Sequence, residues 1–413
     1  MTSDLKEYKL GNICEILSSK RIFAADYVSE GIPFYRSKEI IQKSLGREID
    51  EKLYISTDKF DLIKKHYGAP TEGDILISAV GERSGIPYLV QNETFYFKDG
   101  NLIWLRNFDK SIIDSHYLCY WFKSMIGQSS LNNLMIGSAQ RALTIIGIKG
   151  ISIKLPPLEI QRKIAKVLSA IDDKIELNNS LNNNLEQQAM ALFKQKIIEN
   201  CDNKNGIIGD YCSVKSGYAF KGTWWQDNGV KVIKIKTIDN DSINLNDCSY
   251  VSNDKIEFAK DFIVQGGDLL IAMTGATIGK FAVIPKINEQ LLVNQRVGKF
   301  FLGTEPLNRL AFLYCSLKQQ DIITEIINRG QGSAQPNISS TDIMTTPCYL
   351  PNKCVIDEFN ELCKPIFETI ITNKYENEQL ANLRDTLLPK LMSGEIDVSN
   401  VDISTDKLSF SEV

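Results

Sequence analysis

Two long stretches of the chain place apolar residues alternately four and three positions apart, which is the pattern of a helix that packs along a seam. The first stretch runs from about Pro157 to Ile198. Its seam positions, which include two asparagines, are Ile164, Leu168, Ile171, Ile175, Asn178, Asn182, Leu185, Ala189 and Leu192. The second stretch repeats the register 195 residues later, with a break only at Arg384. Its seam positions are Phe359, Cys363, Ile366, Ile370, Asn373, Asn377, Leu380 and Leu387.

Each stretch predicts a helix of about 40 residues, which would be about 60 Å long at 1.5 Å per residue. Taken alone, either helix could be an amphipathic helix on a surface. The matched registers instead predict that the two helices pair as a coiled coil, because asparagines in a seam fix its register at a cost in stability. A globular segment of about 150 residues separates the two helices, which favours an antiparallel pair.

The segments that precede the two helices also repeat one another. "GDILISAVGERSGIPYLV" (Gly73–Val90) matches "GDLLIAMTGATIGKFAVI" (Gly267–Ile284) at an offset of 194 residues. The tetrapeptide "GSAQ" occurs at Gly137 and again at Gly332, 195 residues apart. "SSKRIFAADYVSEGIPFYRSKEI" resembles "KSGYAFKGTWWQDNGVKVIKIKTI" at an offset of 197–198 residues. Several matches in order at a nearly constant offset indicate the duplication of one unit.

Each globular segment mixes strands and helices without a regular βαβ alternation. "GDILISAV" and "GDLLIAMT" predict buried strands, whereas "SHYLCYWFKSMIGQSSLNNL" and "LNRLAFLYCSLKQQDIITEII" have helical spacing. We therefore predict an α+β fold of two tandem globular domains, each followed by a long helix, related by a pseudo-two-fold internal repeat. The expected bounds are 1–156 for the first domain, 157–203 for the first helix, 204–353 for the second domain, 354–396 for the second helix and 397–413 for a loose tail.

Charge is distributed unevenly along the 413 residues. The net charge of −4 combines +2 in each globular segment, −1 in residues 157–203 and −7 in residues 354–413. Two mildly basic segments are compatible with local basic surfaces. No apolar run approaches the roughly 18–20 residues of a membrane span, and the N-terminus has no signal-peptide pattern. We therefore expect a cytoplasmic protein without a membrane partner.

Patterns that carry catalysis or metal binding are missing from the repeats. The nine cysteines have no CxxC spacing, and only two histidines occur, which argues against a zinc site. His66 and His116 have no counterpart in the second copy. "TGATIGK" (Thr274–Lys280) has only three residues between its glycines, and Phe281 follows its lysine, so it does not match a phosphate loop. The sequence thus predicts a protein that is not an enzyme and has no metal site.

The order of these motifs resembles the specificity subunit of Type I restriction–modification systems. The motifs that carry the resemblance are "SGYAFKG", "GDLLIAMTGATIGK", "NQRV", "GSAQPNIS" and "LPPLEIQRKIAKVLSAIDDKI". The resemblance covers essentially the whole chain. The first copy departs from the family pattern, with "AVGERSG" in place of "TGATIG". The second helix begins "PNKCVIDEF" and lacks the "PPLEIQ" of the first.

The resemblance implies a non-catalytic subunit that binds double-stranded DNA. Each globular part would be a target-recognition domain that reads one half of a split sequence, and the helix pair would hold the two domains apart. The helices would also dock two methyltransferase (modification) subunits, and a restriction/translocase subunit would join the complex. The chain itself would bind no cofactor. S-adenosylmethionine, ATP and Mg²⁺ would be bound by the partner subunits, in the cytoplasm of a prokaryote.

Polar residues at turn edges are the expected DNA contacts, because Lys and Arg bind phosphates while Arg, Gln, Asn and Thr reach base edges. In the first domain these candidates are Lys20, Arg21, Arg36, Lys38, Glu82, Arg83, Gln140 and Arg141. In the second domain they are Lys221, Lys234, Lys236, Thr274, Thr277, Lys280, Arg296 and Gln335. The residues after the two GSAQ stretches differ, "RALT" against "PNIS", so we expect the half-sites to be distinguished near there.

Two other functions stay open on the sequence. The chain could be a coiled-coil scaffold that joins two ligand-binding modules and binds no nucleic acid. It could also be the specificity subunit of another methyltransferase-based defence system.

Overall fold

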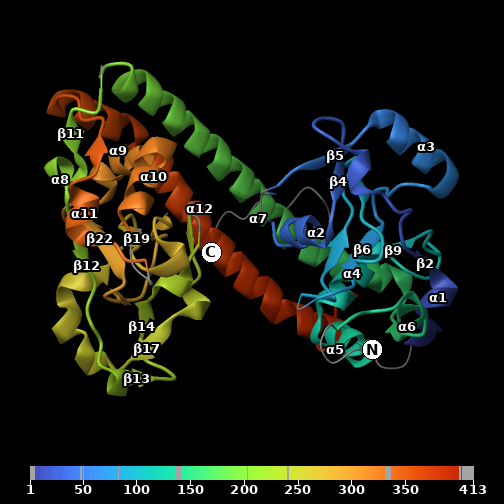
Figure 1. Cartoon of the computed structure of the whole chain (residues 1–413). Helices are drawn as coiled ribbons and strands as arrows, with labels where there is room; N and C mark the ends of the chain where they lie inside the picture. The colour runs from blue at the N-terminus through green and yellow to red at the C-terminus, as the bar shows by residue number, and fades with distance from the viewer. Residues whose placement is uncertain are drawn as a thin grey trace. The chain divides into compact units, whose positions relative to one another are not determined.

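The computed structural model describes residues 5–46, 49, 51–81, 83–135, 141–201, 203–239, 241–330, 336–399 and 401 (Figure 1). Contacts between residues divide the chain into two units. Unit 1 comprises residues 1–176 and 380–413, and unit 2 comprises residues 177–379. Each unit therefore combines one globular segment of the sequence with part of both long helices. Among the described helices, none has the length and apolar character that crossing a membrane requires.

Unit 1 contains two four-stranded sheets. The first is antiparallel in the order β2-β9-β6-β7, with β2 Glu15–Leu17, β9 Leu102–Arg106, β6 Ile75–Ser78 and β7 Pro87–Leu89. The second has the order β3-β5-β4-β8, with β3 Tyr27–Val28, β5 Leu53–Ile55, β4 Ile32–Tyr35 and β8 Tyr96–Phe97. Its strands β4 and β8 are parallel. A separate pair joins β1 Lys6–Lys9 to β10 Ser152–Leu155.

The helices of unit 1 pack on these sheets, and the first long helix follows them in the chain. They are α1 Leu10–Ile13, α2 Ser37–Ser44, α3 Thr57–Tyr67, α4 Ser115–Lys123, α5 Met125–Leu134 and α6 Ile145–Lys149. The long helix α7, Leu158–Phe193, continues into a π-helical turn at Lys194–Ile198. Strand β6 is buried on both faces, because successive side chains of a strand point to opposite sides. Ile75 and Ile77 join the core with α4 and α7, whereas Leu76 packs with Trp104.

Unit 2 contains the same two kinds of sheet. The antiparallel sheet has the order β12-β22-β19-β20, with β12 Ser213–Ser216, β22 Val297–Phe301, β19 Leu269–Ala272 and β20 Phe281–Val283. The mixed sheet has the order β13-β17-β14-β21-β18, with β13 Trp225–Gln226, β17 Ser249–Val251, β14 Val230–Ile233, β21 Leu291–Val293 and β18 Ile263–Val264. Two short pairs are β11 Gly206–Ile207 with β23 Pro347–Cys348, and β15 Ile238–Asp239 with β16 Ser242–Ile243.

Helices cover one face of the antiparallel sheet in unit 2. They are α8 Ile208–Tyr211, α9 Leu307–Leu317, α10 Gln320–Arg329, α11 Ser340–Met344 and the long helix α12 Lys353–Ser393. Leu269 and Ile271 of β19 pack in the core with α9 and α12, whereas Leu270 packs with β14 and β21. Figure 1 shows the same layering, with α9 and α10 on the side of β19 and β22 that faces away from β14 and β17.

Apart from β18 and the β15–β16 pair of unit 2, the two units repeat one topology down to single hydrogen bonds. The N–H of Gly73 donates to the carbonyl of Val90 over 2.9 Å, and the N–H of Gly267 donates to that of Ile284 over 2.9 Å. Gly31 and Gly229 both have a positive backbone φ angle. A Cβ atom at either position would lie 2.3 Å from a carbonyl oxygen of the neighbouring strand. The predicted α+β fold of two tandem, duplicated domains is confirmed.

Polar contacts between α7 and α12 set the direction of the helix pair. In unit 2, the side-chain amide of Asn178 donates to Asn377 over 2.8 Å, and that of Asn373 donates to Asn182 over 2.9 Å. One partner moves four residues up the chain as the other moves four residues down, so the helices run antiparallel, as predicted. The asparagines of the sequence pattern therefore bond to one another across the two helices.

The buried face of each helix departs from the expected seam near the globular domains. Ile164, Leu168, Ile171, Ala189, Phe359, Cys363, Ile370 and Leu380 are buried, while Ile175, Leu185, Leu192, Ile366 and Leu387 are half-buried. Other apolar residues of these helices are buried instead, namely Phe193, Ile197, Phe367, Ile371, Leu388 and Leu391. The reason is that at these points each helix packs against the globular part of the unit in which that segment lies, as well as against the other helix.

Candidate nucleic-acid interface

Five loops of unit 2 lie together at the same ends of its strands, and we call them the loop rim of unit 2. They are Gly217–Lys221, Lys234–Lys236, Thr274–Lys280, Asn294–Arg296 and Pro336–Ser339. Backbone hydrogen bonds connect them: Gln295 N–H to the Tyr218 carbonyl at 3.0 Å, Asn294 N–H to Ile233 at 3.0 Å, Met273 N–H to Arg296 at 3.0 Å and Gly275 N–H to Pro336 at 2.9 Å. The rim thus joins the "SGYAFKG", "TGATIGK", "NQR" and "PNIS" motifs in one place.

Unit 1 builds an equivalent loop rim from the first copy of the sequence. Lys98 N–H donates to Tyr35 over 2.9 Å, Ala79 N–H to Asn101 over 2.8 Å and Gly81 N–H to Arg141 over 3.2 Å. Each of these bonds has its counterpart among the rim bonds of unit 2. The described segment after each GSAQ stretch therefore lies beside the loop that follows β6 in unit 1 and β19 in unit 2. The two GSAQ stretches themselves lie outside the described residues.

The expected contacts of unit 1 differ in whether another side chain neutralises them. Arg83 and Arg141 are exposed, and no ion pair joins either to another described residue. Arg21 is paired with Asp99 at 2.9 Å. Lys20 is exposed and lies 5.0 Å from the centre of the Tyr67 ring. The other candidates are Lys38, which is exposed, and Glu82 and Gln140, which lie outside the described residues.

Arg36 of unit 1 is part of a local ion-pair cluster. Its guanidinium lies 2.6 Å from the carboxylate of Glu39 and 2.8 Å from that of Glu51. Hydrogen bonds to Glu39 and then to Glu51 raise the pKa of Arg36. Because both carboxylates already bind this cation, its charge is compensated within the unit.

The expected contacts of unit 2 also differ in whether another side chain of the unit binds them. Lys221, Lys236 and Arg296 are exposed, Lys234 is half-buried, and no ion pair joins any of the four to another described residue. Thr274 is only 7% exposed, and its hydroxyl donates to Asn337 over 2.9 Å. The hydroxyl of Thr277 donates to the Thr274 carbonyl over 3.0 Å. Both threonines thus hold the loop together. Gln335 lies outside the described residues.

Lys280 belongs to a link between the rim and the helices of unit 2. It pairs at 3.0 Å with Asp239, the last residue of β15 in the β15–β16 hairpin. Asp241 of the same hairpin pairs with Lys318 of α9, and Lys318 also lies 2.7 Å from Glu186 of α7. The "K" of "TGATIGK" therefore fixes a loop to a hairpin that is itself bound to the helices.

The two rims thus share a backbone frame and differ in the side chains that the frame carries. The family model described as "Type I restriction modification DNA specificity domain" matches the chain twice, over residues 2–187 and 200–380. The chain belongs to this family.

Curated specificity subunits match this specificity-domain chain over most of its length. The MjaVIII type I restriction enzyme specificity subunit of Methanocaldococcus jannaschii is 26% identical over 390 residues, which cover 86% of this chain and 89% of that protein. The HindI specificity subunit of Haemophilus influenzae is 22% identical to this chain in an alignment of 473 residues. That alignment covers 95% of this chain and 100% of the HindI subunit. The crystal structure of a Type-I restriction–modification S subunit from M. genitalium has the same fold, with a TM-score of 0.58 at 17% identity over 94% of this chain and 96% of that one.

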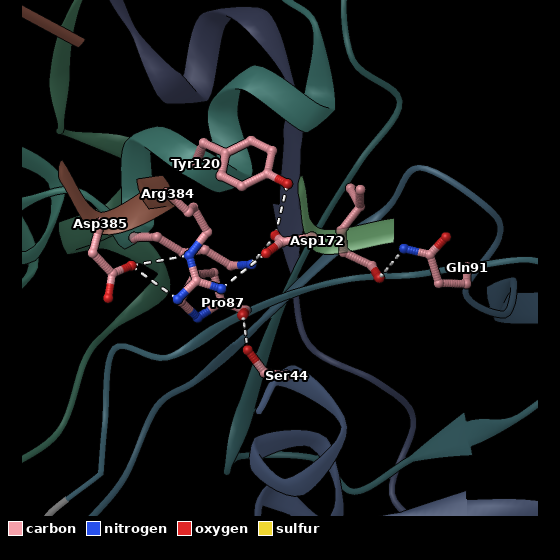
Figure 2. Close-up of polar contacts among 9 residues, drawn as sticks. Ser44, Pro87, Gln91, Tyr120, Asp172, Arg384 and Asp385 are labelled. Atoms are coloured by element: carbon pink, nitrogen blue, oxygen red, sulfur yellow. Dashed lines mark hydrogen bonds and ion pairs between the residues drawn. The ribbon is translucent and has the colours of Figure 1, made fainter. Parts of the chain in front are cut away.

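A polar cluster in unit 1 contains the residue at which the seam pattern breaks. Figure 2 shows Arg384 of α12 directed at Asp172 of α7, at 2.8 Å, with the Tyr120 hydroxyl donating to the same carboxylate over 2.8 Å. Burial lowers the pKa of Arg384, but its hydrogen bonds and charge interactions with Asp172 and Asp385 raise it overall. The break in the apolar pattern is thus a salt bridge between the two helices of this specificity-domain chain.

Two rim residues of unit 2, and one tryptophan beside the rim, were not among the expected contacts. Gln295 is exposed between Asn294 and Arg296, Asn337 bonds to Thr274, and Trp225 lies under Lys234 with 3.4 Å between its ring centre and the ammonium nitrogen. The motif "NQRV" already marked Gln295. The role of Trp225 had no sequence signal, because tryptophans at strand ends are ordinary core residues.

Proposed function

We propose that the chain is the non-catalytic specificity subunit of a Type I restriction–modification system, and that each loop rim reads one half of a split DNA target. The observation that carries the proposal is the rim built twice on the same backbone hydrogen bonds with different side chains. A shared frame with exchanged side chains suits two readers of different sequences, since base edges are read by individual side chains. Family membership supports DNA as the polymer.

The cations that form no ion pair with a described residue occupy different positions of the same frame in the two rims. Unit 1 presents Arg83 and Arg141, where unit 2 has Thr277 and Pro336. Unit 2 presents Lys234 and Arg296 instead, and Arg296 corresponds to Asn101 of unit 1. Phosphate contacts position a protein on DNA, while base contacts specify the sequence. The two units would therefore approach DNA with different sets of contacts.

The remaining parts of the chain would serve the assembly. We assign residues 1–156 and 204–353 to target recognition and residues 157–203 and 354–396 to the helices, with 397–413 as a tail. The helices would dock two modification subunits, which bind S-adenosylmethionine, and a restriction/translocase subunit would bring ATP and Mg²⁺. Such a complex would act on DNA in the cytoplasm of a prokaryote.

Exchange of residues 141–144 with residues 336–339 tests where the half-sites are told apart. These segments lie against the loops after β6 and β19, through Leu143 N–H to Ala79 at 2.8 Å and Ile338 N–H to Met273 at 2.9 Å. We expect the exchange to alter the methylated target motif, measured by mapping modified adenines in cells that also carry the modification subunit.

The matched control exchanges the next five residues, α6 (145–149) with α11 (340–344). These short helices place Ile148 and Ile343 at equivalent buried positions. The control should leave the motif unchanged. An unchanged motif in the first exchange would contradict the assignment of these segments to readout.

Salt dependence separates this function from a scaffold without nucleic acid. A DNA reader assembled with its modification subunit loses affinity steeply as salt rises, because counterions are released from the DNA on binding. A scaffold that binds other ligands through uncharged contacts would show a flat response.

A further inference from the structure

Lys234 of unit 2 is a cation that the unit itself does not neutralise. It follows β14 directly, and its ammonium nitrogen lies 3.4 Å from the centre of the Trp225 ring. The second cation nearby is the exposed Lys236. Burial, and then the charge of Lys236, lower the pKa of Lys234. No carboxylate of a described residue forms an ion pair with Lys234, so its partial burial is uncompensated except by the ring.

Arg36 occupies the equivalent position in unit 1, directly after β4, and its surroundings are the opposite. Glu39 and Glu51 bind its guanidinium at 2.6 and 2.8 Å. The Glu39 side chain is 1% exposed, and one of its oxygens also accepts the backbone N–H of Arg36 over 2.8 Å. This arginine is therefore fixed within its own unit.

Two substitutions between the copies account for the difference. Thr237 stands where unit 1 has Glu39 and is equally buried, but its hydroxyl donates to the carbonyl of Lys234 over 2.8 Å and carries no charge. Asp247 stands where unit 1 has Glu51, and it accepts a hydrogen bond from Asn244 over 2.7 Å. The fold has kept the position of the cation, while one of its two carboxylates is replaced by a hydroxyl and the other accepts from Asn244 instead.

Other rim residues of unit 2 add to the positive charge near Lys234. Asn294 N–H donates to Ile233, the residue before Lys234, and this bond brings the loop of Arg296 beside it. Lys221 lies 5.5 Å from the centre of the Trp224 ring, next to Trp225. An anion that reaches this part of the rim would find several basic side chains and, at Lys234, one held in place by an aromatic ring.

We propose that Lys234, placed over Trp225 beside Lys236, binds a backbone phosphate of the DNA half-site read by unit 2, and that Arg36 makes no such contact in unit 1. A phosphate would supply the anion that Thr237 and Asp247 do not, through charge-assisted hydrogen bonds. The inference rests on the proposed DNA-binding function and adds to it that the two recognition domains hold the DNA backbone through different residues.

The test measures the affinity of the full chain, in complex with its modification subunit, for a fluorescent duplex that contains the target, across about 50–200 mM salt. For Lys234→Gln we expect log Kd against log salt to become shallower by about 0.9, the value of one phosphate contact. The decrease in this slope should be similar on a duplex without the target, because a phosphate contact carries no sequence information. Lys234→Arg should restore the slope.

Two further variants make the comparison between the units. Thr237→Glu restores the missing anion beside Lys234, and it should reduce the slope as Lys234→Gln does, although it leaves the lysine in place. Arg36→Gln/Glu39→Gln removes the equivalent buried ion pair of unit 1 without changing the net charge, and the Glu51 carboxylate that loses Arg36 is exposed to water. This double variant should leave the slope unchanged. Thermal melting of each variant shows that the fold is retained.

The outcomes separate this inference from the function on which it rests. If the unaltered complex binds no duplex, the proposed function fails and the inference fails with it. If the unaltered complex binds with a steep salt dependence and Lys234→Gln has the same slope, only the inference is overturned. An equal decrease of slope in Arg36→Gln/Glu39→Gln would overturn the difference between the units.

Discussion

Replacing Phe359 by alanine lowers the free energy of unfolding of unit 2 by about 3–5 kcal/mol. The Phe359 side chain is fully buried, and its ring centre lies 5.6 Å from that of Phe193 on the other long helix. The same core includes Phe312 of α9 and Ile271 of β19. The cavity would thus open where both helices meet the antiparallel sheet of unit 2. For a unit of about 200 residues, each kcal/mol changes Tm by about 2–4 °C, so Tm should fall by about 10 °C.

Leu362→Ala is the matched control, since it removes an apolar side chain from the same helix one turn away. Leu362 is 45% exposed. Surface substitutions of this kind change stability by no more than about 0.5 kcal/mol. Calorimetry of the full chain compares the two variants. Equal losses in both would mean that α12 does not pack into the core as described.

A chain in which Arg83 and Arg141 are both alanine binds its duplex at least about thirty-fold more weakly than the unaltered chain. Both side chains are exposed on the loop rim of unit 1 without an ion pair to a described residue. Loss of a good arginine contact to a base costs about 1–3 kcal/mol, and each 1.4 kcal/mol is about tenfold in Kd. The backbone of the rim should be unaffected, because Arg83 and Arg141 hold the loop through their carbonyl groups.

Arg21→Ala serves as the control for this prediction. Its side chain is 68% exposed in the same unit, but it is paired with Asp99 at 2.9 Å. We expect its Kd to stay within about threefold of the unaltered chain, as exposed ion pairs contribute little. Fluorescence anisotropy of the complex with the modification subunit measures all three. Unchanged affinity in Arg83→Ala/Arg141→Ala would contradict the assignment of these residues to DNA contact.

The fold could be predicted from the sequence because its signals are periodic or repeated. The four-and-three spacing gave both long helices, and the constant offset near 195 residues gave the duplication. The matched asparagines indicated that the two helices pair with each other, and the long globular segment between them indicated that the pair is antiparallel. Phe193 and Phe367 were missed because the helix ends pack against a globular domain, and one seam cannot describe a helix with two packing partners.

The DNA contacts of the rim were harder to predict, because the ion-pair partners that neutralise a charged residue can lie far away in the sequence. Arg21 is bound by Asp99, and Lys280 is bound by Asp239, 41 positions earlier. Nothing local distinguishes these cations from Arg83 or Arg296. Thr274 looked like a polar loop residue, but the neighbouring segment covers it. Arg384 interrupts the apolar pattern of its helix, and its role depends on its partner Asp172 on the other helix.

A map of methylated adenines across a genome tests the central claim most directly. Cells that carry this chain and its modification subunit are compared with cells that lack the chain. Two recognition domains on one chain predict a split motif, with two defined half-sites separated by a spacer of unspecified sequence, which disappears without the chain. A continuous motif, or a methylation pattern that is the same with and without the chain, would contradict the account.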